Sequence, residues 1–199
     1  MQDWVKPVTL EGRVVRLEPL HPRHASGLLA AATPDLFEFT PQNPREYSVA
    51  GFLEDIEKVN AIPDSLAFAI IHRASGEVAG RTTYMEIRPV HRGLEIGRTW
   101  IARTHQGTHL NPEMKLLMMR HAFGTLGAIR VQYKTGHRNL HSQRAIAKLG
   151  AIREGELRNH QIEPDGRVRN TVVFSITREE WPVIERGLEA RLTASSNPK

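Results

Sequence analysis

The sequence places a strand, a helix and a second strand close together between residues 94 and 135, and this order is the strongest constraint on the fold. Residues 94–101 carry the β-branched, aromatic and apolar side chains that are typical of a strand. Residues 114–123 are too long a run, and too rich in Leu and Met, to be a strand, so they predict a helix that Gly127 is placed to end. Residues 129–135 predict the second strand. Because the connections are short, the unit predicts a right-handed crossover between parallel strands.

The turn before this helix, residues 106–111, has the features of an anion site. Asn111 is expected to cap the helix, with Pro112 at its first position and Glu113 near the positive end of the helix dipole. Gly107 is the only glycine of the turn, and it allows several backbone N–H groups to point outward beside the helix N-terminus. Ligands of open sheets bind beyond the carboxyl ends of parallel strands, which is where this turn lies. The sequence therefore predicts a phosphate-binding turn.

The remaining segments predict an α/β (α+β) fold: a mixed, mostly antiparallel sheet with flanking helices around the central parallel unit. Further strands are expected within residues 8–20 and at 65–72, 78–87, 151–159 and 168–176, with turns at 74–77 and 163–167. Further helices are expected at residues 22–32, 46–59 and 178–192, and from a cap at Asn139 to a stop at Gly150, with a loop at 40–45.

The composition is that of an ordinary globular protein. The 199 residues, 40% of them hydrophobic, are enough for one domain spanning residues 1–199, with a tail at 193–199 that we expect to be disordered. The absence of cysteine excludes disulfides, zinc-cysteine sites and a thiol nucleophile. A formal charge of +5 favours an anionic ligand. Apolar runs are too short for a membrane span and the first residues lack a signal-peptide core, so we expect a cytoplasmic protein. We expect the chain to fold alone or as a homo-oligomer such as a homodimer.

Several motifs together resemble the GNAT superfamily of acyl-CoA N-acyltransferases, and most closely its RimJ/RimL-like branch of ribosomal-protein N-terminal acetyltransferases. The resemblance extends from residue 14 to residue 181. It includes the turn with Gln106, Gly107 and Asn111, and then Asn139-Leu140-His141-Ser142, Lys148-Leu149-Gly150-Ala151, Gly155-Glu156-Leu157-Arg158-Asn159-His160, Asp165-Gly166-Arg167 and Arg178-Glu179-Glu180-Trp181. It implies a GNAT-like fold and transfer of an acetyl group from acetyl-CoA to a primary amine by direct attack in a ternary complex.

The resemblance also implies where acetyl-CoA binds, with its pyrophosphate on the turn at 106–111 and its pantetheine arm between the two diverging parallel strands. The implied cofactor-binding residues are Ile101, Ala102, Arg103, Gln106, Gly107, Thr108, His109, Leu110, Asn111, Asn139 and Ser142. One position departs from the family pattern, because His109 stands where a glycine usually sits. Its β-carbon could narrow the approach of the pyrophosphate, or its imidazole could meet the pyrophosphate.

Two carried-over residues, Asn139 and Ser142, lie one helical turn apart at a helix start. The resemblance implies that Asn139 contacts pantetheine or orders the cleft and that Ser142 donates to the leaving CoA thiolate. Local capping of the helix explains both residues equally well.

The resemblance implies Glu95 as the candidate catalytic base, because RimJ/RimL-like enzymes often carry a Glu before Ile-Gly at this point of the central strand. Partial burial would raise the pKa of such a carboxyl group and suit it to taking a proton from the acceptor ammonium. The alternative is a solvated carboxylate on the strand. The thioester carbonyl would be polarised by a backbone N–H group near residues 101–103. Arg130, Lys134 and Arg138 could help to hold the CoA phosphates.

The acceptor amine is the least determined part of this hypothesis. It could be a small molecule or a protein N-terminus, and residues 34–63 are expected to shape its pocket. The alternative function is a non-catalytic RNA- or ribosome-binding module on the same scaffold, suggested by a pI near 9.9, although no basic run interleaved with aromatic residues supports nucleic-acid binding. No metal is expected, because the histidine pairs at 105/109 and 137/141 do not share a helical face.

Overall fold

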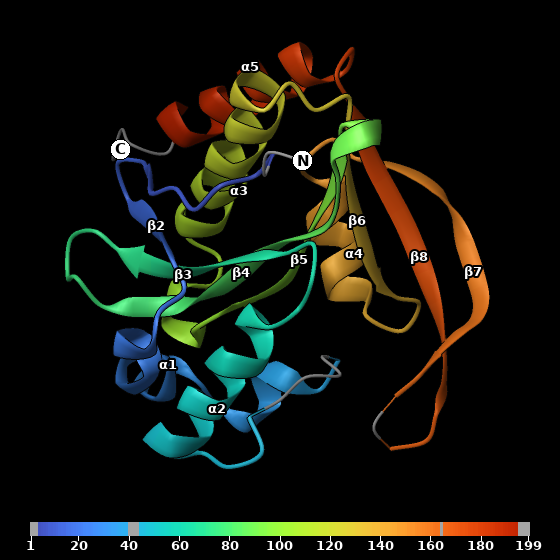
Figure 1. Ribbon diagram of the computed structural model, residues 1–199. Helices are drawn as coiled ribbons and strands as arrows, with labels where there is room; N and C mark the ends of the chain where they lie inside the picture. Colours follow the sequence, from blue (N-terminus) through green and yellow to red (C-terminus); the bar gives the residue numbers. More distant parts are fainter. Residues whose placement is uncertain (1–3, 40–43, 164, 195–199) are drawn as a thin grey trace.

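A computed structural model describes residues 4–39, 44–163 and 165–194, and one eight-stranded sheet runs through them in the order β1-β2-β3-β4-β5-β6-β8-β7 (Figure 1). The strands are β1 (Leu10–Glu11), β2 (Val15–Pro19), β3 (Leu66–His72), β4 (Val78–Arg88), β5 (Gly93–Ile101), β6 (Arg130–Gly136), β7 (Ile152–Ile162) and β8 (Val168–Thr177). All neighbouring strands pair antiparallel except β5 and β6, which are parallel. The predicted mixed sheet with a central parallel pair is confirmed.

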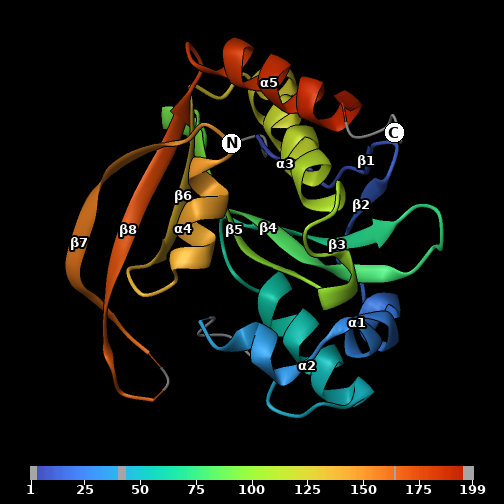
Figure 2. The ribbon, with the colours of Figure 1, turned by 180° about the vertical axis from the view of Figure 1, so that it is seen from behind.

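Five α-helices flank the sheet in the described residues. They are α1 (Ala25–Ala31), α2 (Val49–Asn60), α3 (Leu110–Arg120), α4 (Leu140–Ala147) and α5 (Trp181–Ala194), with 3₁₀ turns at η1 (Pro22–His24), η2 (Pro34–Phe37), η3 (Pro89–His91) and η4 (Arg103–His105) and a π turn at His121–Thr125. Figures 1 and 2 show α3 and α5 on one side of the sheet and α1 and α2 on the other. None of the helices in the described residues is long and apolar enough to cross a membrane.

The apolar residues of β3 alternate between two cores, as a strand buried on both faces requires. Phe68 and Ile70 pack into the core beneath α3 and α5. Ala67, Ala69 and Ile71 pack into the second core beneath α1 and α2. The sheet therefore separates the molecule into an α3 face and an α2 face.

The parallel pairing of β5 with β6 is short. It covers only Gly93 with Arg130, Leu94 with Val131, and Glu95 with Gln132, although both strands continue beyond these residues. The two strands therefore diverge toward their carboxyl ends, and the predicted diverging pair is present.

The start of α3 differs from the sequence prediction. The N-cap residue is His109, and Asn111 lies inside the first turn instead of capping it. The Thr108 hydroxyl accepts a hydrogen bond from the Leu110 N–H at 3.2 Å, and Leu110 is fully buried in the core. Burial of Leu110, supported by the Thr108 hydroxyl, explains why the helix begins earlier than the Asn-Pro pair suggests.

Other boundaries are shifted by a few residues. Helix α2 begins at Val49, later than predicted, because the Ser48 hydroxyl accepts the Gly51 N–H at 3.1 Å and caps it. Helix α5 includes Thr193 and Ala194, two residues of the predicted tail. The predicted loop at 40–45 and the rest of the tail lie largely outside the described residues. The predicted stops are confirmed, since Gly127 and Gly150 both have positive φ, at +65° and +97°.

Glu113 ties α3 to the beginning of the sheet. Its buried carboxylate accepts the backbone N–H groups of Arg13, Val14 and Val15 at 2.7–2.9 Å. These groups precede or begin β2, so one carboxylate satisfies three backbone donors where the chain enters the sheet. Its role is therefore larger than the helix-dipole contribution expected from the sequence.

Replacing Glu113 with Ala should lower the free energy of unfolding by about 2–4 kcal/mol, because three backbone donors lose a charged acceptor. Denaturant unfolding would measure the change, with the exposed Glu179→Ala as the control. A loss for Glu113→Ala no greater than for the control would show that these bonds contribute nothing net.

Candidate active site

A cleft of about 910 Å³ opens where β5 and β6 diverge. Its walls come from β5, β6, the turn before α3, the start of α4, η2 and the hairpin of β7 and β8. The residues predicted for the site that line it are Glu95, Ile101, Arg103, Gln106, Gly107, Asn111, Asn139 and Ser142. The fold therefore brings distant residues together in one cleft: Glu95 and Ser142 are 47 positions apart in the sequence.

The turn at 106–111 presents open backbone to the cleft. Gly107 has φ +73°, a conformation that favours glycine, and a β-carbon at this position would meet no protein atom within 4 Å. The space in front of Gly107 can therefore take a phosphate. The Gln106 side chain donates to the Ile101 carbonyl at 2.9 Å, which fixes the turn against the end of β5.

Three turn residues do not line the cleft with their side chains. The Thr108 hydroxyl donates to the His105 carbonyl at 2.7 Å, and Leu110 is buried in the core. His109, at the N-cap, is half-buried outside the lining of the cleft. The imidazole that we considered as a pyrophosphate contact therefore does not form part of the wall, and Thr108 and Leu110 could contribute only backbone atoms.

Of the backbone N–H groups predicted to polarise the thioester carbonyl, those of Ile101 and Ala102 point to opposite sides of β5. The Ala102 N–H donates to the Ala79 carbonyl of β4 at 2.8 Å, so it is already engaged. Successive residues of a strand direct their N–H groups to opposite sides, so the Ile101 N–H points away from β4 and toward the gap. Ile101 is thus the better candidate for polarising a carbonyl in the cleft.

Asn139 and Ser142 open helix α4 at the cleft. The Asn139 side chain accepts the Ser142 backbone N–H at 2.9 Å, which confirms the predicted cap. Both residues line the cleft, and the Ser142 hydroxyl has no hydrogen-bond partner within the described part of the chain. The cap thus leaves this hydroxyl available to a ligand.

Glu95 is a buried carboxylate, with 4% of its surface exposed. Burial raises the pKa of Glu95, against the opposing effect of Lys134, whose Nζ lies 3.2 Å from Oε2. The Gln132 amide donates to the same oxygen at 3.3 Å. The solvated alternative is therefore wrong, and the raised pKa makes the carboxylate a better proton acceptor than an exposed glutamate.

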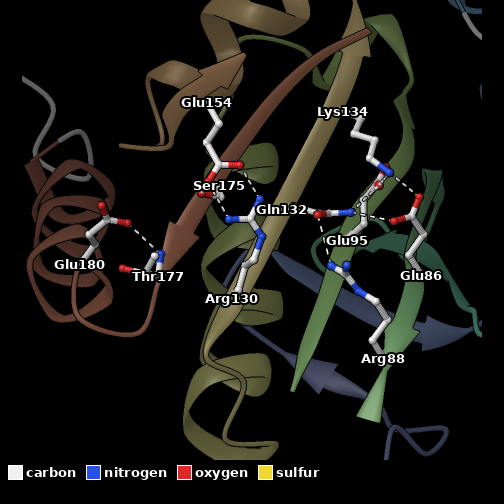
Figure 3. A network of polar contacts seen from close by, with 10 residues as sticks. All are labelled: Glu86, Arg88, Glu95, Arg130, Gln132, Lys134, Glu154, Ser175, Thr177 and Glu180. Carbon is white, nitrogen blue, oxygen red and sulfur yellow. Dashed lines mark hydrogen bonds and ion pairs between the residues drawn. The ribbon is translucent and has the colours of Figure 1, made fainter. Parts of the chain in front are cut away.

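A second carboxylate, Glu86, shares these partners (Figure 3). Lys134 forms an ion pair with Glu86, and the Gln132 amide donates to Glu86 at 2.8 Å. The side-chain oxygen of Gln132, Oε1, accepts a hydrogen bond from Arg88 at 3.2 Å, which fixes the orientation of the Gln132 side-chain amide. The network holds Glu95 in place on the α2 face of the sheet.

Lys134 and Arg130, which we considered as CoA-phosphate ligands, have other partners. Lys134 is engaged by the two carboxylates of this network, and Arg130 forms a bidentate pair with Glu154 of β7. Figure 3 shows the Arg130 pair on the opposite side of Gln132 from Glu95. Because of these ion pairs, neither residue is positioned to hold a phosphate at the turn of residues 106–111.

Lys115, which is not predicted from the sequence, projects from α3 into the region between the diverging strands. Its Nζ donates to the Thr99 hydroxyl of β5 at 3.0 Å and lies 5.6 Å from the centre of the Tyr133 ring of β6. Burial lowers the pKa of Lys115 to about 7. Its position four residues after Asn111, on the same side of the helix, was the available signal.

Arg98 and Arg169 also line the cleft and were not predicted. Nothing in the strand pattern marks them, because one lies at a bulge of β5 and the other enters from β8. Among the described residues, no group of three or more His, Asp or Glu side chains could hold a metal ion.

The sequence matches the family described as "Acetyltransferase (GNAT) domain" over residues 15–152. No curated protein matches it. A crystal structure of a protein assigned as an acetyltransferase is 41% identical, covers 98% of this chain and 100% of its own, and has a TM-score of 0.90. The structure of a GCN5-related N-acetyltransferase from Brucella melitensis is 32% identical, with coverage of 96% and 90% and a TM-score of 0.89.

RimJ from Mycobacterium smegmatis, solved in complex with CoA-disulfide, has the same fold. It is 24% identical, covers 93% of this chain and 95% of its own, and has a TM-score of 0.78. At this identity the similarity concerns the fold alone.

The stability of the protein should depend on pH through Lys115. The ordinary pKa of 10.5 applies to the unfolded chain, whereas burial lowers the value to about 7 in the folded protein. Between these values the unfolded state binds more protons, so the free energy of unfolding should rise with pH.

Lys115→Met should flatten this rise by up to about 4 kcal/mol, and the exposed Lys148→Met should not. Urea unfolding at a series of pH values between 7 and 10.5 would measure the difference. Parallel curves for the wild type and Lys115→Met would mean that the buried amine keeps its ordinary pKa.

Proposed function

Because this chain belongs to the GNAT acetyltransferase family and is an acetyl-CoA-dependent N-acetyltransferase, we propose that it acetylates a primary amine by direct attack in a ternary complex. One observation carries the proposal. A single cleft connects the open backbone at Gly107 with the buried carboxylate of Glu95, through the gap between β5 and β6. The gap is the route by which a thioester held on one side can meet an amine held on the other.

Acetyl-CoA binds with its pyrophosphate at the turn of residues 106–111. The positive end of α3 and the free space at Gly107 support this position. The pantetheine arm enters the gap between β5 and β6, beside Asn139 and Ser142. The family resemblance implies the same position, between the two diverging parallel strands. There the Ile101 N–H polarises the thioester carbonyl.

Glu95 takes a proton from the acceptor ammonium, which leaves a neutral amine with a free electron pair. The amine nitrogen attacks the thioester carbonyl carbon and forms the new N–C bond. The nitrogen then loses its second proton as the C–S bond breaks, and the sulfur leaves either as a thiolate that accepts a hydrogen bond from Ser142 or, by taking up that proton, as the thiol of CoA. A cysteine acyl-enzyme is excluded because the chain has no cysteine.

Within the family, we propose the RimJ/RimL-like branch, with a protein N-terminal amine as a candidate acceptor. The motifs from Asn139 onward support this choice. The non-catalytic RNA- or ribosome-binding alternative loses its basis, because the family accounts for the cleft and the charge does not require RNA.

Incubation with acetyl-CoA and a panel of amines, followed by mass spectrometry, tests the proposal. The panel should contain ribosomal-protein N-terminal peptides, amino acids and polyamines. We expect at least one amine to gain a single acetyl group while free CoA accumulates in equal amount. Tight acetyl-CoA binding with no acetylated amine would contradict the proposed reaction.

Blocking the turn should weaken acetyl-CoA binding. Gly107→Val and Asn111→Leu should each raise the dissociation constant roughly tenfold or more, because they place side chains where the pyrophosphate is expected. Isothermal titration calorimetry would measure this. Gly76→Val is the matched control, since Gly76 has φ +74° and equally open surroundings but lies in the turn between β3 and β4. Equal dissociation constants for all four proteins would remove the turn from the binding site.

Removing the base should lower the rate and leave CoA binding intact. Glu95→Gln should reduce kcat roughly 100-fold, within the usual contribution of a general base. In the wild type kcat/KM should rise with pH through the raised pKa of Glu95, because only the carboxylate accepts a proton.

Glu95→Gln should abolish this acidic limb. Glu86→Gln should move it to lower pH, since the Glu86 charge helps to raise the pKa of Glu95. An unchanged rate and pH profile in Glu95→Gln would exclude Glu95 as the base.

A further inference from the structure

Two arginines in the cleft have guanidinium nitrogens without partners. Arg98 Nη1 and Arg169 Nε are both buried, and neither has a hydrogen-bond partner within the described part of the chain. Neither guanidinium group forms an ion pair among those residues. Buried donors are nearly always satisfied, so two such donors on one cleft wall indicate an absent acceptor.

Both side chains lie on the α2 face, the same face as Glu95. On β8, Arg169 is two residues before Thr171, which pairs with Gly136 of β6, and a β-carbon at Gly136 would lie 3.1 Å from Arg169 Nε. Residues two apart on a strand share a face, so Arg169 lies on the face of Lys134 and Glu95.

Arg98 is assigned to this face by the charges around it. Burial lowers the pKa of Arg98, with a further lowering by Arg81, whereas Glu95 and Asp55 raise it. Arg81 forms a buried ion pair with Asp55 of α2. The charged groups that act on Arg98 therefore all belong to the α2 face, and Arg98 lines the cleft together with Glu95.

The backbone of Arg98 is held in an unfavourable conformation. Its φ of +49° lies in the left-handed region, at a point where the register between β4 and β5 shifts. A non-glycine residue in this region is strained, and such residues concentrate at binding sites. The bulge turns the Arg98 side chain into the cleft at the expense of regular pairing.

The two arginines are separated from the phosphate-binding turn by the sheet. The turn and Lys115 belong to the α3 face, where Lys115 reaches Thr99. Among the cleft carboxylates, Asp35 pairs with Arg103 and Glu86 pairs with Lys134. Neither Glu38 nor Glu95 forms an ion pair with either arginine within the described residues. The CoA phosphates are therefore not the missing acceptor.

We propose that Arg98 and Arg169 bind a carboxylate of the acceptor, which is therefore a primary amine that carries a carboxylate close to its amino group. This inference rests on the proposed function and specifies its substrate class. Glu95 attracts the ammonium group, and the guanidinium groups beside it attract the carboxylate, so the two charges orient the amine toward the gap. Guanidinium groups suit this task because their N–H donors match both oxygens of a carboxylate.

The test compares acceptors that differ only in the carboxylate. One arm uses free amino acids, their carboxamides and the corresponding amines without a carboxyl group. The other arm uses peptides with Asp or Glu at the first or second position, together with their Asn and Gln counterparts. In at least one arm, kcat/KM should be roughly 10- to 100-fold higher for the acid than for the amide. The responding arm identifies the source of the carboxylate.

Arg98→Gln and Arg169→Gln should each raise KM for the acid at least about tenfold and change KM for the matched amide less than about twofold. The control is Arg158→Gln, an exposed position on β7 outside the cleft. Arg98→Lys should recover part of the preference, since it keeps the charge. Unchanged acetyl-CoA affinity and melting temperature would show that the variants fold.

Equal use of acids and amides by the wild type in both arms would overturn the inference. So would an equal loss of activity toward acid and amide in the arginine variants. In both cases acetyl transfer would still occur, and the proposed function would stand. Failure of the proposed function is a different result, in which no amine of either charge is acetylated.

Discussion

The early end of the parallel pairing between β5 and β6 is the constraint on which the rest of the site depends. After Glu95 and Gln132 the backbones of the two strands no longer form hydrogen bonds with each other, and backbone groups near Ile101 are left facing the gap. Helix α3 covers the gap on one side, and the network of Lys134 and Glu86 borders it on the other. A regular sheet at this point would close the cleft and remove the site.

The sheet also separates two kinds of charge. The α3 face holds the helix start, the open turn at Gly107 and the buried amine of Lys115, and the cleft carboxylate of Asp35 is paired with Arg103 just before the turn. On the α2 face, Glu95 lies among Lys134, Arg98 and Arg169. This distribution of charge favours an anionic co-substrate on the α3 face. On the α2 face it favours an acceptor that carries both an ammonium group and a carboxylate.

The sequence predicted the sheet, its parallel pair and most helices, because the periodicity of apolar residues and the glycine stops at Gly127 and Gly150 are local signals. The family resemblance identified Glu95 as a candidate, but whether it faces the cleft or solvent depends on the strand register, which the sequence left open. It did not predict the cap at His109, since the burial of Leu110 is a tertiary effect. Arg98 and Arg169 were missed for the same reason: a bulge and a pairing between β6 and β8 bring them to the cleft, and neither leaves a pattern in the sequence.

The central claim is that acetyl-CoA occupies the gap between β5 and β6 from the α3 face. Hydrogen exchange of the backbone amides, measured by mass spectrometry with and without CoA, tests it most directly. The account predicts that CoA slows exchange in residues 101–111 and 139–142 and leaves β1 and β2 unchanged. Protection confined to other segments, with unaltered exchange in residues 101–111, would contradict it.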